Sequence, residues 1–364
     1  MPFEHGTFTV SFFELPCDLD DDFIEEFQNN RAGLLDSVQD EPQVGWVSGR
    51  HLLENNIDEK TAMKGGAIYL NLRKAERKMP GTLLNAICKR EELIWLQANP
   101  NAQFVPSKVK KQIKEEAREK HIMKMPPAIS GIPMVIDPAS RMMYLGSSSA
   151  TQIDDFIGFF YKTTNVEPIQ LTPGRMLETM FQVTQSSFPM LSFCDKVDRE
   201  PSPGRDFLTW LWYYSEDHGK VTHEQFGEFE LMLEGPLTFS FLSETSGSAE
   251  TTVKKGDSPL QSAEAKAALS VGKKLKKAKL TITRGEEIWS GMFDADRFAF
   301  GSFSLPEGEE MDQESRFAER MTNLFIFTEG FKLFFKKYAE TVLSIHWPEE
   351  ERRIREWAKN RESF

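Results

Sequence analysis

Apolar residues along the first 165 positions recur with the periods of short strands and amphipathic helices. Residues 6–15 alternate between apolar and polar side chains, which predicts a strand, and the AIYLNL segment at 67–72 predicts a buried strand. PMVI at 133–136 and MMYL at 142–145 flank a polar turn and predict a hairpin. This part of the chain is therefore expected to form an N-terminal α+β unit over residues 1–165.

A pair of helices is expected inside this unit. Apolar residues at helical spacing predict a helix over 82–97, and Ser107 is the expected N-cap of a second helix over 108–124. The second helix should stop before Pro126 and Pro127. Because only a short polar loop joins them, the two helices should fold back on each other. We call this segment, about residues 80–126, the finger.

The rest of the chain predicts a connection and a second unit. Residues 166–205 hold five prolines and little periodicity, as expected for a connection. Residues 206–364 predict a C-terminal α+β unit, in which Gly235-Pro236 turns a strand pair and residues 313–343 form a long helix. The expected fold is α+β, with mixed or antiparallel sheets, the two-helix finger, a long C-terminal helix and a charged tail.

Composition and charge narrow the functional classes. The chain has 364 residues, 44 Lys and Arg against 56 Asp and Glu, and three cysteines without a CxxC pair. The cysteine count argues for a reducing compartment. No apolar run is long enough to span a membrane, and the acidic first 30 residues do not resemble a secretory signal. We therefore expect a soluble cytoplasmic protein.

Basic residues are concentrated in three windows although the net charge is −12. Residues 73–90 carry six basic residues against one acid, 108–124 carry seven against three, and 254–284 carry nine against two. Clustered Lys and Arg neutralise phosphates and release counterions without base contacts, whereas acidic surfaces elsewhere repel a polyanion. The same runs could also be solvated faces, so composition alone leaves nucleic-acid binding open.

No segment carries a convincing catalytic motif. Asp257 with Glu264 and Lys266 is the nearest arrangement to a metal-dependent nuclease, but the Glu-Ala-Lys triplet lies in a helical stretch. Asp294 and Asp296 read as turn residues between two strands. The acids at 20–22 read as a helix N-terminal cluster that complements the helix dipole. We expect no enzymatic activity, no metal and no cofactor.

The order of several segments resembles the recombination-associated RdgC family, in its longer variants. The resemblance spans roughly residues 45–343, and individual motifs are degenerate. The segments that carry it are GWVSGRHLL (45–53), AIYLNLRKAERKMP (67–80), SKVKKQIKEEAREK (107–120), MVIDPASRMMYLGSSS (134–149), VEPIQLTP (166–173) and FLTWLW (207–212).

The resemblance implies a ring-shaped homodimer that encircles duplex DNA without sequence preference, restrains a RecA-type recombinase and is associated with the nucleoid. Binding of single strands stays open. The finger would help to close the ring, although MPPAISGIP at 125–133 departs from the family pattern there. The residues expected to contact DNA are Arg73, Lys74, Arg77, Lys78, Lys108, Lys110, Lys111, Lys114, Arg118 and Lys120 on or near the finger, and Lys273, Lys274, Lys276, Lys277 and Lys279 in the second unit.

Two other functions stay open. The first is a metal-dependent nuclease built on Asp257 and Glu264. The second is an acidic scaffold that binds a basic protein and has no affinity for DNA, with the lysines serving only solubility.

Overall fold

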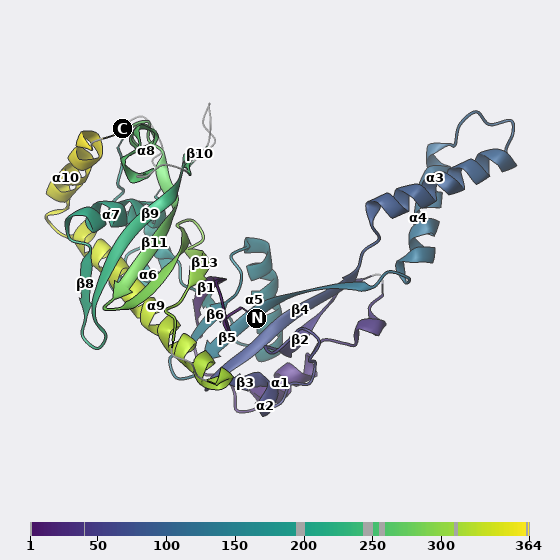
Figure 1. Cartoon of the computed structure of the whole chain (residues 1–364), viewed down its shortest axis with the longest axis horizontal. Helices are drawn as coiled ribbons and strands as arrows, with labels where there is room; N and C mark the ends of the chain where they lie inside the picture. Colours follow the sequence, from purple (N-terminus) through teal and green to yellow (C-terminus); the bar gives the residue numbers. More distant parts are fainter. Residues whose placement is uncertain are drawn as a thin grey trace. The chain divides into compact units, whose positions relative to one another are not determined.

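The chain forms two compact units, shown in the computed structural model of Figure 1. The first comprises residues 1–19, 63–68 and 134–364, and the second comprises 20–62 and 69–133. The sequence predicted domain boundaries at 165 and 206. The two compact units are divided elsewhere and are discontinuous in sequence, so the domain boundaries stay a prediction. The structure describes residues 2–39, 41–193, 201–242, 250–254, 259–308, 312–361 and 363.

The strands of the first unit form a sheet in which each pair of neighbouring main strands is antiparallel. Three short strands pair with longer ones: β3 (Met63–Lys64) with β4 (Ala67–Arg77), β7 (Ile169–Gln170) with β1 (Phe8–Glu14), and β8 (Lys220–His223) with β9 (Gly227–Ser240). An α+β fold with a large antiparallel sheet is thus confirmed. The main strands, in sheet order, are β10 (Glu250–Val253), β9 (Gly227–Ser240), β11 (Lys274–Arg284), β12 (Glu287–Asp294), β13 (Ala299–Ser304), β1 (Phe8–Glu14), β6 (Met142–Leu145) and β5 (Pro127–Asp137).

The predicted turn at Gly235-Pro236 is wrong, because β9 continues through it. Lys279 of β11 pairs with Glu234, and Lys277 pairs with Thr238, so the intervening residues of β9 form an irregularity in the ladder. A proline cannot donate a ladder hydrogen bond, and such an irregularity accommodates it without reversing the chain.

Helices pack on this sheet through an aromatic core. The predicted long helix is confirmed as α9 (Gln313–Leu343), whose Phe331 lies 5.6 Å from Phe207 of α7 and 5.2 Å from Phe293 of β12, between ring centroids. Gly330 is required on α9, because a Cβ there would approach the Phe229 ring to 2.9 Å. The other helices of the unit are α5 (Ala150–Thr164), α6 (Pro173–Phe181), η2 (Gln185–Ser187), α7 (Pro203–Asp217), η3 (Pro259–Gln261), α8 (Ala263–Ser270) and α10 (Trp347–Asn360).

Arg361 holds the C-terminal helix in place. Its guanidinium lies 4.4 Å from the Trp212 ring centroid and 4.6 Å from that of Trp357. It donates to both Glu216 carboxylate oxygens, at 2.8 and 2.7 Å, and Lys266 Nζ donates to the Arg361 carbonyl at 2.7 Å. We call this arrangement the arginine latch. It joins the end of α10 to α7 and α8 by charge-assisted hydrogen bonds and cation–π contacts.

The second unit holds the finger and a small packed base. The finger helices α3 (Gly81–Ala98) and α4 (Ser107–Ile122) confirm the predicted pair. The expected N-cap is wrong by one position, because Pro106 is the N-cap of α4 and Ser107 is its first helical residue. In the base, Trp46 packs on Phe27 with ring centroids 5.0 Å apart. The base comprises α1 (Phe23–Asn29), η1 (Leu35–Ser37), β2 (Gln43–Ser48), α2 (Glu59–Ala62), and the portions of β4 (Ala67–Arg77) and β5 that enter this unit.

None of the helices in the described ranges combines the length and apolar character needed to cross a bilayer.

Candidate nucleic-acid interface

The two arginines of β4 that were expected to contact DNA hydrogen-bond to backbone carbonyls of the chain instead. Arg73 is buried, and its guanidinium donates to the carbonyls of Leu52, at 3.1 Å, and Gly33. Burial lowers the pKa of Arg73 from its ordinary value. Arg77 donates through Nε to the Val38 carbonyl at 2.7 Å and through Nη1 to the carbonyls of Met123 and Met125, which follow α4. Both guanidiniums therefore satisfy backbone carbonyls within the second unit.

The two lysines of this segment lie at the surface. Lys74 is exposed, and so is Lys78, which makes an ion pair with Glu76. The hydrogen bond from Lys78 lowers the pKa of Glu76. Of the four basic residues expected here, Lys74 and Lys78 are thus the two that solvent reaches fully.

Helix α4 presents an exposed surface rich in basic residues, which also carries Glu115, Glu116 and Glu119. Ile113 and Ala117 are buried four positions apart on one side, Ile122 is buried near the C-terminal end, and Lys110, Lys114 and Arg118 follow a different stripe of the helix. Lys111 makes a long i,i+4 ion pair with Glu115, at 3.9 Å, and in the described part of the chain the other basic residues expected on α4 have no carboxylate within ion-pair distance. The exposed basic residues are Lys108, Lys110, Lys111, Lys114, Arg118 and Lys120.

A groove of about 350 Å³ lies between α3 and α4. Ile94, Trp95 and Ile113 supply apolar walls, and the carboxylates of Glu91 and Glu116 also line it. Lys120 and His121 line it as well, so the groove borders the basic residues of α4 and carries charged side chains of both signs.

The basic run at the start of β11 differs sharply from α4, because its first two lysines are buried. Lys273 Nζ donates to Thr251 Oγ1 at 2.6 Å and lies 5.2 Å from the Phe241 ring centroid. Lys274 Nζ donates to Asp206 Oδ1 at 2.6 Å and to Ser202 Oγ at 2.8 Å. These two ammonium groups are turned toward partners inside the unit.

Carboxylates also hold the remaining three lysines of the run. Lys276 Nζ lies 3.6 Å from Glu250 and 3.9 Å from Asp296. Lys277 pairs with Asp294 at 2.8 Å, and Lys279 pairs with Glu234 at 2.7 Å. All three side chains retain some solvent exposure, unlike Lys273 and Lys274.

Of the residues considered for nuclease chemistry, Lys266 and Asp294 serve structural roles, and Glu264 is exposed in the first turn of α8. Lys266 donates to the Arg361 carbonyl in the arginine latch, and Asp257 lies outside the described residues. The turn interpretation of Asp294 is confirmed, because its Oδ1 accepts from the backbone nitrogens of Asp296 and Arg297 at 3.1 and 3.2 Å.

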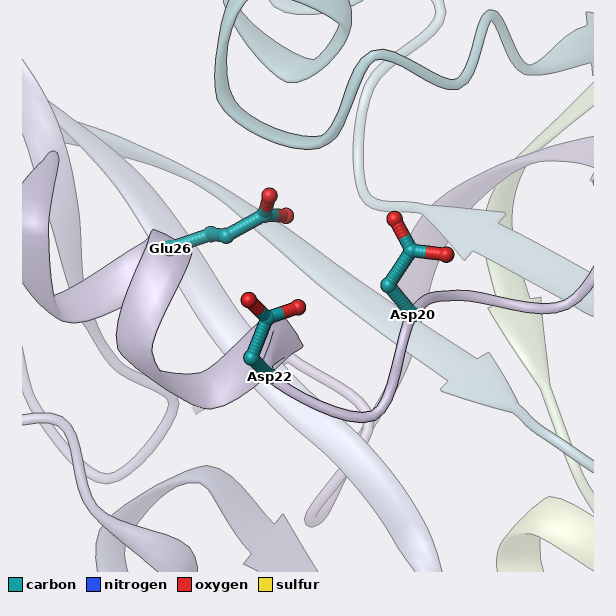
Figure 2. Close-up of side chains that lie close together, drawn as sticks. All are labelled: Asp20, Asp22 and Glu26. Atoms are coloured by element: carbon teal, nitrogen blue, oxygen red, sulfur yellow. The ribbon is translucent and has the colours of Figure 1, made fainter.

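Figure 2 shows an acidic cluster at the start of α1. The carboxylates of Asp20, Asp22 and Glu26 each offer an oxygen within 4.8 Å of the others, close enough to share a metal ion. Burial, and then the charges of Asp22 and Asp20, raise the pKa of Glu26. Sequence reasoning assigned the first two acids to the helix start and missed Glu26, although its i,i+4 spacing from Asp22 is a usable signal.

Comparison with known proteins supports one assignment. Residues 10–180 match the family model described as "RdgC: Putative exonuclease, RdgC". Curated proteins gave no match. The matched range contains α3, α4 and the acidic cluster, whereas the basic run of β11 lies outside it.

Proposed function

We propose that this chain, which belongs to the RdgC family through residues 10–180, is a recombination-associated protein that binds duplex DNA without catalysing a reaction. The observation that carries the proposal is the exposed basic surface of α4, which lies inside the family range. Lysines and arginines on one side of a helix neutralise phosphates at successive positions and need no base contacts. The binding should therefore be independent of sequence.

The acidic character of the remaining chain supports a confined binding surface. The net charge is −12 although α4 itself is basic, so most of the molecule repels a polyanion. DNA is thus directed to α4, together with Lys74 and Lys78. Arg73 and Arg77 contribute by holding the base of the finger.

The finer parts of the proposal rest on the family resemblance. They are a homodimer that closes as a ring, restriction of the access of a RecA-type recombinase to DNA, and association with the nucleoid. Ring closure would involve residues 125–133, where Ile129 of β5 is exposed.

The salt dependence of DNA affinity tests the proposal. If α4 makes about six phosphate contacts, affinity for a linear duplex should fall by about 10³-fold between roughly 50 and 200 mM salt. Fluorescence anisotropy with duplexes of unrelated sequence measures the slope, and light scattering with and without DNA measures the stoichiometry. A slope near zero would contradict phosphate contacts, and no binding even at low salt would favour the acidic scaffold.

A nuclease is the second candidate, because the family description names an exonuclease and the Asp20, Asp22 and Glu26 carboxylates could bind a divalent cation. Incubation of an end-labelled duplex with Mg²⁺ or Mn²⁺ decides between the two functions. If the labelled strand becomes shorter with the unaltered chain but not with an Asp22→Asn or Glu26→Gln variant, the non-catalytic proposal is overturned. The same assay on Asp257→Asn and Glu264→Gln variants covers the pair expected from the sequence.

A further inference from the structure

Two lysines of β11 are held by carboxylates on the neighbouring strands. Lys279 Nζ lies 2.7 Å from Glu234 of β9, and Lys277 Nζ lies 2.8 Å from Asp294 of β12. Both lysine side chains are 41% exposed, and their i,i+2 spacing places them on one face of the sheet. They form a small cationic pair whose charge is cancelled within the folded chain.

The Lys279–Glu234 pair is exposed on both sides and can exchange with solvent ligands; the Lys277 ammonium is exposed too, although its partner Asp294 is buried. An ion pair at the surface adds little to stability, because water solvates both partners and their side chains lose entropy on pairing. Lys274 is different, since both it and its partner Asp206 are buried. An incoming anion can therefore reach Lys277 and Lys279 without opening the core.

A carboxylate and a DNA phosphate offer a lysine the same kind of anionic oxygen acceptor. While Glu234 and Asp294 occupy the lysines, a phosphate must displace them and leave two carboxylates unpaired near the DNA. The carboxylates thus compete directly with DNA for the same ammonium groups, and they lower the affinity of this face without a change of fold.

We propose that Glu234 and Asp294 form an electrostatic gate, which keeps Lys277 and Lys279 from DNA until phosphates displace the carboxylates. This inference rests on the proposed DNA binding and assigns a second, self-inhibited phosphate site to β11. The gate acts as a graded competition: each carboxylate lowers the affinity of its lysine for phosphate by the small free energy of the ion pair.

The gate is tested by removing one carboxylate charge. Glu234→Gln should raise the affinity for a linear duplex by about two- to fivefold, the range that surface ion pairs allow. The slope of log affinity against log salt should also steepen by about 0.9, because the freed lysine gains one phosphate contact. Adding Lys279→Gln to the Glu234→Gln chain should cancel both effects.

A matched variant separates the gate from a general gain of charge. Glu356→Gln removes one carboxylate from an exposed pair with Arg352 on α10, where the separation is 3.2 Å. Equal gains from the Glu234 and Glu356 variants would overturn the gate. Lack of binding by the unaltered chain at low salt would instead refute the proposed function, so the two failures are distinct.

Asp294→Asn provides a second test at the other lysine. Because Asp294 also accepts backbone hydrogen bonds in its turn, its thermal unfolding is measured alongside. A gain in affinity that Lys277→Gln cancels supports the gate, and no gain in a chain that remains folded contradicts it for this pair.

Discussion

Reversing three charges on α4 is expected to lower DNA affinity by about 10²- to 10³-fold at roughly 0.1 M salt, because three phosphate contacts are lost. The variant combines Lys110→Glu, Lys114→Glu and Arg118→Glu, which occupy one exposed stripe at i, i+4 and i+8. Glu favours helix nearly as well as Lys and Arg, so α4 should stay folded. Fluorescence anisotropy measures the affinity, and the salt slope should become shallower by about three.

A charge-matched chain controls for the overall change of −6. Lys336→Glu, Lys337→Glu and Lys359→Glu alter three exposed lysines on α9 and α10, outside the family range. We expect this chain to bind DNA far better than the α4 variant. Equal losses in both chains would show that net charge, and not contact with α4, controls binding.

Replacing Lys274 by Ala should destabilise the protein by about 3–5 kcal/mol, the cost of leaving one member of a buried ion pair alone. Asp206 is 2% exposed and would lose the ammonium group that lies 2.6 Å from its Oδ1. Urea unfolding followed by tryptophan fluorescence measures the change. Lys279→Ala serves as the control, because its surface pair should cost only about 0–1 kcal/mol.

The loss in the Lys274→Ala chain should shrink as the pH falls. Burial already raises the pKa of Asp206, and removing Lys274 takes away the charge that opposes this rise. Above the unfolded pKa and below the folded one, the native state binds more protons than the unfolded state, so its stability increases with decreasing pH. A deficit that is the same at about pH 5 and pH 7 would contradict an unpaired Asp206 carboxylate.

Local patterns predicted the elements with a strong helical period. The finger helices and α9 have apolar stripes and end at prolines, loops or polar caps, and these signals are short-range. The strand through Gly235-Pro236 could not be predicted in this way, because the register of β11 accommodates the proline irregularity.

Counting charges along the sequence predicted the segments in which basic residues are concentrated. It did not predict which of these residues are exposed to solvent. Lys274 is paired with Asp206, which lies 68 positions earlier in the chain. Arg73 is held by a carbonyl 40 positions earlier. Such partners are set by tertiary packing, whereas the exposure of α4 follows from its own helical pattern.

The arginine latch has a practical consequence for handling the protein. Shortening the chain before Arg361 removes a guanidinium that touches two indole rings and neutralises Glu216. The Trp212 and Trp357 indoles would then donate to a carboxylate without its counterion, and α10 would be free to detach. Preparations clipped by protease before Arg361 should therefore be discarded before binding is measured.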